Sequence, residues 1–330
     1  MPDRRLDPAP AGVGTAVADT SAPGTTHART IAQVVALASQ ALASQALASQ
    51  ALASQALATR AGERREALAH EIVAALLDVG RHWPRLHADD PADAALAGRA
   101  TEAARRLARG MPFQYAVERA SFRHLTLHVD SRVLIPRPET ELLVDLVLEA
   151  TGHAPGGTVV DVGTGSGAIA LALAEEGRFR RVIATDVSAD ALAVARGNAE
   201  ALGPRLAAPV ELRQGSLLGP VAGMRARAIV SNPPYISFDE AAALPALVRD
   251  WEPVTALLSA DQGLAVTREL VRDAAAHLES GGTLALEVDA RRAALVAEMV
   301  AGNAAFSSVS VRLDLAGRER FVLARRREWR

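Results

Sequence analysis

The sequence of 330 residues contains no cysteine, which excludes disulfides, thiolate metal ligands and a cysteine nucleophile. Aromatic residues make up only 3% of the chain, so Ala, Leu and Val must fill most of the core. No run of about 18 uninterrupted apolar residues occurs, as a membrane span would need. The N-terminus lacks the basic and apolar stretches of a secretory signal. We therefore expect a soluble, cytoplasmic protein.

Positive charge is not in excess either. The 36 Lys+Arg residues, all of them Arg, stand against 38 Asp+Glu and give a formal net charge of -2. A protein that coats nucleic acid usually carries a surplus of basic residues, so we expect no direct nucleic-acid partner. As a separate expectation, we take the protein to be a monomer. The content of 49% hydrophobic and 22% charged residues is that of a globular chain, and the length predicts about two domains.

The first part of the chain divides into three segments. Residues 1–30 lack apolar periodicity and are expected to form a disordered tail. Residues 31–118 have helical spacing and include four ALASQ copies from Ala36 to Gln55, whose period of five spreads the leucines around a helix without a single apolar face. We interpret the repeat as an expansion that lengthens a helix. Residues 119–135 alternate apolar and polar positions and predict a β-hairpin linker.

Residues 136–330 predict an α/β domain, because apolar strands alternate with helical patterns. This alternation indicates a doubly wound, mostly parallel sheet of seven strands, and the short AGR turn between the last two strands makes that pair antiparallel. The expected strands are 158–162, 181–186, 210–214, 226–231, 283–288, 307–314 and 320–325.

A glycine-rich turn follows the first of these strands. In VVDVGTGSGAIALALAEE, Gly163, Gly165 and Gly167 let the backbone take positive φ and approach a ligand at a helix N-terminus. Asp186 ends the next strand, where a carboxylate can bind a ribose diol. The turn predicts a nucleotide-like cofactor.

The glycine-rich turn alone is compatible with two kinds of cofactor. Gly163, Gly165 and Ala168 also satisfy the dinucleotide fingerprint of dehydrogenases. Asp161, just before the turn, favours a cationic methyl donor, since S-adenosylmethionine carries an amino group and a sulfonium instead of a pyrophosphate. A glycine-rich turn that binds nothing is the remaining interpretation.

The motif Ser231-Asn232-Pro233-Pro234-Tyr235 follows the fourth strand. Its prolines fix the backbone, so the Asn232 side-chain oxygen and the Pro233 carbonyl can accept both hydrogens of a planar NH2 group, with Tyr235 against its face. Holding such a weak nucleophile in line with a methyl group needs no strong base. N-P-P is also an ordinary rigid turn, but beside the ribose site it indicates a methyltransferase acting on a planar nitrogen.

At this point the sequence resembles the peptide chain release factor N5-glutamine methyltransferases, class I S-adenosylmethionine-dependent enzymes with a Rossmann-like domain. The resemblance covers about Glu63 to Arg325 and rests on GMPFQY, VLIPRPETELLV, DVGTGSGAIALALA, ATDVSADALAVARGNA, VSNPPYI, WEPVTAL with DQGL, and DLAGRERF. PRPETE joined to NPPY is its most specific part. It implies methyl transfer to the glutamine amide of the Gly-Gly-Gln loop of class-1 release factors, with the N-terminal helical domain gripping the protein substrate.

The resemblance also implies site residues. Those expected at the donor are Asp161, Gly163, Thr164, Gly165, Gly167, Asp186, Ser216, Leu217 and Asn232. Those expected at the substrate are Pro136, Arg137, Glu139, Asn232, Pro233, Pro234 and Tyr235, of which Asn232, Pro233 and Tyr235 are the catalytic set. Together with Pro138 and Thr140, the residues Pro136, Arg137 and Glu139 are expected to wall the pocket where the two domains meet. The alternative is that they serve only as a good helix start, as they would in any protein.

The chain departs from the family pattern after Glu287, where Gly and then Gln are usual and this chain has Asp289, Arg291 and Arg292. His124 and His128 have no nearby Cys or acidic cluster to complete a coordination sphere, so we expect no metal. Three rival functions stay open: an amino-methyltransferase acting on RNA or DNA bases, a non-catalytic nucleotide-binding protein, and a dehydrogenase.

Overall fold

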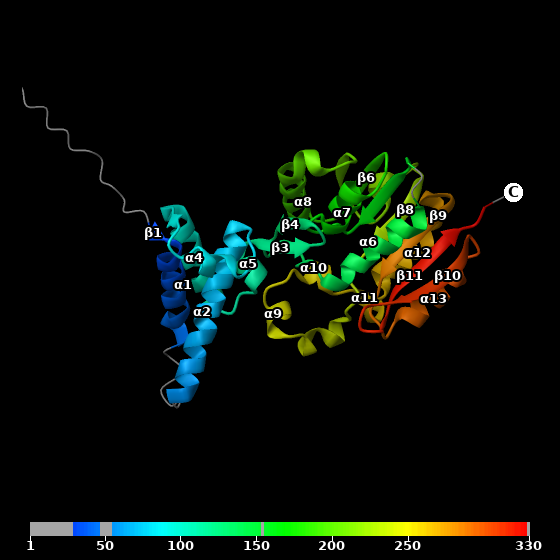
Figure 1. The fold of residues 1–330 in the computed structure, drawn as a ribbon. Helices are drawn as coiled ribbons and strands as arrows, with labels where there is room; N and C mark the ends of the chain where they lie inside the picture. Colours follow the sequence, from blue (N-terminus) through cyan, green and yellow to red (C-terminus); the bar gives the residue numbers. More distant parts are fainter. Residues whose placement is uncertain (1–28, 47–54, 153–154, 329–330) are drawn as a thin grey trace, which may run out of the picture.

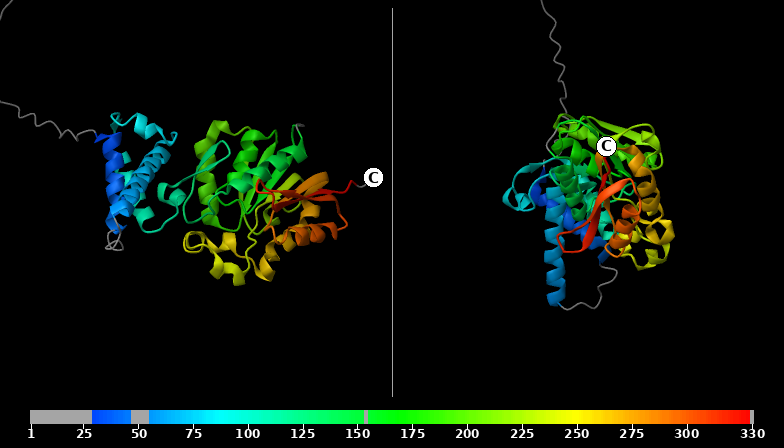
Figure 2. Two further views of the ribbon diagram at one scale, coloured as in Figure 1. Left: turned by 60° about the horizontal axis from the view of Figure 1, so that its bottom comes forward. Right: turned by 90° about the vertical axis from the view of Figure 1, so that its right-hand side faces the viewer.

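The computed structural model describes residues 29–46, 55–152 and 155–328. Residues 1–28 of the expected disordered tail and part of the ALASQ repeat therefore lie outside the described residues. The last two residues of that expected tail, Arg29 and Thr30, are ordered as a short strand that pairs with Pro91 and Ala92. The chain is elongated, with a helical bundle at one end and a β-sheet flanked by helices at the other (Figure 1). A small hairpin lies between the two parts, as Figure 1 and the left view of Figure 2 show.

The helical bundle packs α1, α2 and α4 around Ile72, Val73 and Ala100, all fully buried. Asp93 caps α4, its side chain accepting a hydrogen bond of 2.6 Å from the Leu96 amide, as expected for an N-cap. The elements of this part are β1 (Arg29–Thr30), α1 (Ile31–Ala46), α2 (Gln55–Leu77), α3 (Trp83–Leu86), β2 (Pro91–Ala92), α4 (Ala94–Ala108) and α5 (Phe113–Val117).

The first copies of the repeat belong to this bundle and differ from the expectation of a helix without an apolar face. Helix α1 buries Val34, Ala38, Ala41 and Leu42 along one side. Alanine is small enough to complete a buried stripe between leucines, so a period of five still gives a packing face over two copies. The later copies continue into residues that are not described.

The second part is a seven-stranded sheet in the order β10-β11-β9-β8-β5-β6-β7. Strands β9, β8, β5, β6 and β7 are parallel, and β11 is antiparallel to both β9 and β10. The strands are β5 (Thr158–Val162), β6 (Arg181–Asp186), β7 (Val210–Gln214), β8 (Ala226–Ser231), β9 (Leu278–Glu287), β10 (Phe306–Leu313) and β11 (Glu319–Arg326). The predicted mostly parallel sheet with an antiparallel C-terminal pair is confirmed.

Helices cover both faces of this sheet. Val159 of β5 packs with α6 and α7, whereas its neighbour Val160 faces α12 and α13, because successive side chains of a strand point to opposite faces. The flanking elements are α6 (Pro138–Thr151), α7 (Ala168–Glu176), α8 (Ala189–Leu202), η1 (Gly203–Arg205), η2 (Gly219–Val221), α12 (Ala265–His277) and α13 (Ala293–Ala301).

A segment of short helices follows β8, with bounds η3 (Phe238–Ala243), α9 (Ala246–Arg249), α10 (Val254–Leu257) and α11 (Ala260–Gly263). We call residues 236–263 the lid segment. Helix α12 follows the lid segment and leads into strand β9, which starts at Leu278, earlier than the expected 283. The additional residues include Gly281 and Gly282, and the register of β9 with β8 shifts between Ala226 and Ala228.

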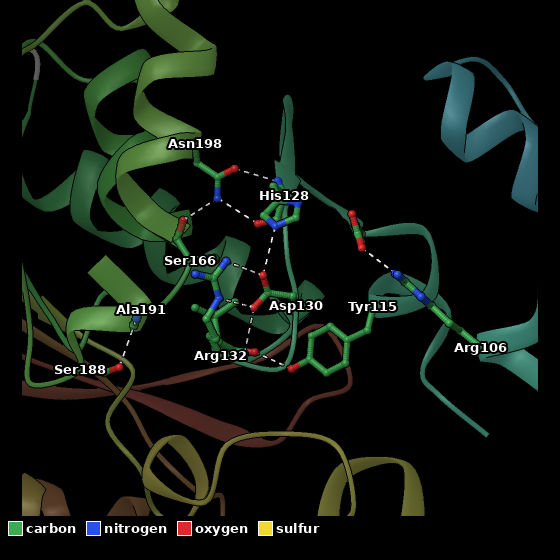
Figure 3. Close-up of polar contacts among 11 residues, drawn as sticks. Arg106, Tyr115, His128, Asp130, Arg132, Ser166, Ser188, Ala191 and Asn198 are labelled. Carbon is green, nitrogen blue, oxygen red and sulfur yellow. Dashed lines mark hydrogen bonds and ion pairs between the residues drawn. The ribbon is translucent and has the colours of Figure 1, made fainter. Parts of the chain in front are cut away.

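The hairpin of β3 (Arg119–Phe122) and β4 (Leu125–His128) joins the two parts. Asn198 of α8 fixes its end, accepting from the His128 amide at 2.7 Å and donating to the His128 carbonyl at 3.0 Å and the Ser166 carbonyl at 2.9 Å (Figure 3). The Tyr115 hydroxyl donates to the Val133 carbonyl. These bonds place residues 132–134 beside the glycine-rich turn.

Candidate active site

The glycine-rich turn joins β5 to α7 at the carboxyl edge of the sheet. Gly163, Gly165 and Gly167 all have positive φ, at +74°, +56° and +86°. A Cβ at Gly163 or Gly165 would meet nothing within 4 Å, whereas one at Gly167 would lie 3.0 Å from Leu171. The first two glycines therefore leave space open for a ligand, and the third permits close packing of the turn on α7.

Asp186 lies opposite this turn at the end of β6. One carboxylate oxygen accepts a hydrogen bond from the Gly165 amide and the other from the Ser188 amide, each at 2.9 Å. These two bonds hold the carboxylate in place. Each oxygen keeps a further lone pair for a ligand hydroxyl.

A cavity of about 240 Å³ opens at the carboxyl ends of β5, β6, β7 and β8. This is where open α/β sheets bind ligands. Leu217 has a positive φ of +47°, and its carbonyl accepts from the Thr185 hydroxyl at 3.1 Å, a strained conformation of the kind that concentrates at functional sites. Expected donor residues on its wall are Gly163, Gly165, Asp186, Ser216, Leu217 and Asn232.

Asp161 and Thr164 lie beneath the turn and outside the lining of this cavity. Asp161 is fully buried, and one of its oxygens accepts from the Thr164 hydroxyl at 2.7 Å and the Ala170 amide at 3.1 Å. Burial raises the pKa of Asp161 to about 7. In this arrangement both side chains support the turn from within, and the donor contact expected of them stays a prediction.

A second cavity, of about 180 Å³, adjoins the first. The two share Leu134, Asn232 and Ala256 in their linings. Asn232 thus lies between a space bounded by the glycine-rich turn and a space bounded by the lid segment. The second cavity is lined by Leu134, Arg137, Asn232, Tyr235, Ile236, Leu244, Val248, Ala256 and Leu257.

The NPPY residues divide between these cavities. Pro233 and Pro234 line the first, Tyr235 the second, and Asn232 both. Burial raises the pKa of Tyr235 to about 12, so its hydroxyl is neutral at physiological pH. Gly263 of the lid segment touches this turn: a Cβ there would lie 2.2 Å from the Tyr235 carbonyl oxygen.

The PRPETE residues have different surroundings in the structure. Arg137 lines the second cavity, and its Nη2 atom donates to both carboxylate oxygens of Glu252 at 2.6 and 2.7 Å. Glu139 instead pairs with Arg318 at 3.4 Å. Pro136 and Glu139 are outside the linings of both cavities, and their role at the substrate stays a prediction.

Two polar residues at the site, Glu252 and Glu287, escaped prediction as site residues, whereas Thr140 was expected in the pocket wall. Buried Glu252 anchors Arg137, and Thr140 and Glu287 form a buried hydrogen-bonded pair behind Asn232. Thr140 is part of PRPETE and Glu252 of WEPVTAL, so both motifs pointed toward them. Only the fold brings Glu287, at the end of β9, next to them.

The departure from the family pattern after Glu287 forms an ion-pair cluster with the lid segment. Arg292 binds Glu240 of η3 at 2.7 Å and donates to the Gln262 carbonyl at 2.7 Å. Arg291 binds Glu240 and Asp289 at 2.7 and 2.9 Å. These residues attach both ends of the lid segment to the loop after β9.

Two family models match this chain. The model described as Methyltransferase small domain covers residues 138–249, which include both glycine turn and NPPY. The model described as PrmC N-terminal domain covers residues 38–117, the helical bundle. The first match places the cavities in a methyltransferase domain.

Curated relatives decide the family. The release factor glutamine methyltransferase of Moorella thermoacetica is 44% identical over 71% of this chain and 82% of its own. That of Xylella fastidiosa (strain Temecula1) is 40% identical over 78% of this chain and 92% of its own. The chain belongs to the release factor glutamine methyltransferase family.

A structural comparison agrees with the fold of this family. The hMettl16 catalytic domain, crystallised with an RNA hairpin, has a TM-score of 0.50 and 16% identity, and the match covers 73% of this chain and 86% of that domain. At this identity the likeness concerns the fold alone. Among the described residues, no helix is long and apolar enough to cross a membrane, and no cluster of three His, Asp or Glu side chains could hold a metal ion.

Proposed function

We propose that this protein transfers the methyl group of S-adenosylmethionine to the N5 side-chain amide nitrogen of the glutamine in the Gly-Gly-Gln motif of class-1 release factors. The observation that carries the proposal is the position of Asn232 on the walls of both cavities. A group that binds the acceptor nitrogen must face the methyl donor on one side and the acceptor on the other.

The first cavity fits the methyl donor. Gly163 and Gly165 leave their Cβ positions open, Asp186 presents an anchored carboxylate for the ribose, and Val187 supplies an apolar surface that is 63% exposed. S-adenosylmethionine supplies an electrophilic methyl group on a sulfonium. Binding and orienting it is the task of this turn and of the ends of β6 and β7.

The second cavity fits the acceptor side chain. The Asn232 Oδ1 atom and the Pro233 carbonyl are the acceptors for the two hydrogens of the glutamine NH2. The neutral Tyr235 closes one side of the space. With S-adenosylmethionine bound, the glutamine nitrogen would bond to the methyl carbon as the bond from that carbon to the sulfonium sulfur breaks, leaving a neutral thioether, and the nitrogen would release one proton to solvent. Alignment by Asn232 and Pro233 together with fixed dipoles supplies the rate acceleration.

The release factor is the acceptor named by the curated relatives, which match this chain over most of their length. The helical bundle of residues 31–118 is inferred to grip that protein substrate. We also infer a monomeric, cytoplasmic enzyme without a nucleic-acid partner. The formal net charge of -2 supports the last of these inferences, because a protein that coats nucleic acid usually carries a surplus of basic residues.

The test supplies labelled S-adenosylmethionine with either a class-1 release factor or total RNA. Label should enter the release factor and be lost when its Gly-Gly-Gln glutamine is replaced by alanine. Label entering RNA alone would replace the proposal with the rival base methyltransferase.

Asn232→Ala tests the role of the central residue. The variant should lose turnover by roughly a hundredfold or more, as when a positioned transition-state acceptor is removed, while the Kd for S-adenosylmethionine stays within a few-fold in calorimetry. Asn303→Ala removes an amide outside both cavity linings and should leave turnover unchanged. If Asn232→Ala lost donor binding and kept its chemistry, the assignment would be wrong.

A further inference from the structure

Behind Asn232 lies a relay of two buried polar residues from different elements. The Thr140 hydroxyl, in the first turn of α6, donates to the Glu287 Oε2 atom at the end of β9 over 2.7 Å. The same hydroxyl oxygen accepts from the Asn232 Nδ2 atom at 3.2 Å. Thr140 is 5% exposed and Glu287 1%, so water contributes little to either bond.

The chemistry of this relay gives it a direction. A hydroxyl carries one proton, and an ionised carboxylate can only accept. The Thr140 hydroxyl therefore uses its proton in the hydrogen bond to Glu287. Only the lone pairs of the Thr140 oxygen then face Asn232. The carboxamide must then turn its NH2 toward Thr140 and its oxygen away from it.

Without such a constraint, an asparagine amide has two orientations that differ only by exchange of oxygen and nitrogen. One offers an acceptor to the glutamine NH2, and the other places two N–H groups against it. The backbone of the NPPY turn fixes where the side chain begins but not which of these ends faces the substrate. To select one orientation of the amide, a neighbouring group must accept a hydrogen bond from it and must not donate one to it.

We propose that Thr140 and Glu287 are positioning residues that orient the Asn232 carboxamide so that its oxygen faces the acceptor nitrogen. This inference rests on the proposed function, in which that oxygen holds the glutamine amide. Neither residue lines a cavity, so both act through Asn232 and not on the substrate.

The direction of the relay depends on the ionisation of Glu287. The charged and titratable groups around it are Arg137 and Glu139 before and in α6, Arg320 of β11, and Tyr235 after β8. Burial raises the pKa of Glu287 to about 7, against the opposing effects of Thr140, Arg320 and Arg137. A protonated Glu287 can donate to Thr140, whose own proton is then free to point at Asn232 and reverse the amide.

The first test compares three threonine variants in the full-length enzyme with a release factor as substrate. Thr140→Val removes the hydroxyl at nearly constant shape and should lower kcat by about tenfold to a hundredfold, the scale of a misplaced catalytic group, with the Kd for S-adenosylmethionine unchanged. Thr140→Ser keeps the hydroxyl and should restore most of kcat. Thr283→Val makes the same change at another buried threonine, four residues before Glu287 in β9 and outside both cavity linings, and should leave kcat unchanged.

The second test is the pH dependence of kcat, which can be measured even if Thr140→Val fails to fold. In the wild type, kcat should rise with pH through about 7 as Glu287 ionises. The side chain of Glu287→Gln cannot ionise, so the rise of kcat with pH should be absent in this variant. Identical pH profiles for the two proteins, or full activity of Thr140→Val, would overturn the relay.

These outcomes separate the relay from the proposed function. If Asn232→Ala is inactive and Thr140→Val is as active as wild type, the relay is wrong and the acceptor role of Asn232 stands. If Asn232→Ala is itself fully active, the proposed function is wrong and the relay falls with it.

Discussion

Gly263 is a single residue on which the position of the NPPY turn depends. Its φ is +85°, and an added Cβ would lie 2.2 Å from the Tyr235 carbonyl oxygen, closer than any real contact. Gly263→Ala should displace Tyr235, reduce kcat severely and cost about 1–2 kcal/mol of stability from the backbone conformation alone. Steady-state kinetics and urea unfolding measure the two effects.

The matched control for this change is Gly223→Ala. Gly223 also has a positive φ, +74°, but its Cβ would meet nothing within 4 Å. This variant should share the stability loss caused by the backbone conformation and keep its activity. Equal kinetics for the two variants would show that the contact between Gly263 and Tyr235 is irrelevant to the site.

At the residue scale, sequence motifs predicted the residues that line the cavities better than those that support them. Gly163, Gly165, Asp186 and Asn232 stand in motifs whose chemistry is local, and the structure brings them to one edge of the sheet. Glu287 gave no such signal, because its role depends on a neighbour 147 positions away in sequence. Asp161 was expected at the donor because an acidic residue just before the turn suits a cationic ligand, but its side chain lies below the turn, outside the lining of the first cavity.

The lid segment is the element whose position rests on charged groups. Glu240 binds Arg291 and Arg292, each at 2.7 Å, and also closes a capping box with Ser237 in η3. Glu240→Ala should loosen this segment and raise the KM for the release factor several-fold, because the segment forms one wall of the second cavity. Hydrogen exchange over residues 236–263 should increase in parallel.

Asp239→Ala is the control for Glu240→Ala. Asp239 is the neighbouring exposed residue of η3, so the change removes the same formal charge without breaking the ion pairs to Arg291 and Arg292. KM and exchange should stay at wild-type values. Parallel increases in both variants would assign the effect to net charge and not to these pairs.

At the element scale, periodicity predicted the central strands with their bounds, since β5, β6, β7 and β8 match the expected ranges. Strands β5, β6 and β8 are mostly apolar and buried, whereas β7 alternates apolar and polar residues at the edge of the sheet. The lid segment was not predicted as a set of short helices, because helices of four to six residues leave almost no periodic signal and depend on caps and tertiary pairs such as Glu240 with Arg292.

The stability of the whole molecule should depend on pH through Asp161. Burial raises its pKa from 3.8 to about 7, so the native state binds a proton more tightly than the unfolded chain. Its contribution is therefore complete below pH 4 and declines as pH rises to about 7. The same sign applies to Glu287, whose pKa is also raised to about 7.

Asp161→Asn removes this titration. A pKa shift of one unit corresponds to about 1.36 kcal/mol. The free energy of unfolding of the wild type should therefore decrease as the pH rises from 5 to 7.5, and the decrease should be about 2 kcal/mol smaller in the variant. Urea unfolding at the two pH values measures the difference. The comparison within each protein cancels any constant loss caused by the amide, and equal falls in both proteins would contradict the buried titration.

At the scale of the whole molecule, alternation of strands and helices was enough to predict the fold class, and the short AGR turn was enough to predict the antiparallel pair at the C-terminal end of the sheet. It did not give the strand order, because sequence spacing does not say that β8 returns to the far side of β5 or that β9 and β11 become neighbours. Those choices depend on which apolar faces bury each other, as Val159 and Val160 do on opposite sides of the sheet.

The strand order has a consequence for the order in which the chain acquires its structure during synthesis. The helical bundle is built from contacts within residues 31–117, whereas β5 gains its second neighbour only with β8 and β9 gains its own only with β11. Loop closure over such separations is slow. We expect the helical bundle to fold first as the nascent chain emerges. The parallel strands of the catalytic sheet should then lack some of their neighbouring strands until β11 has been synthesised.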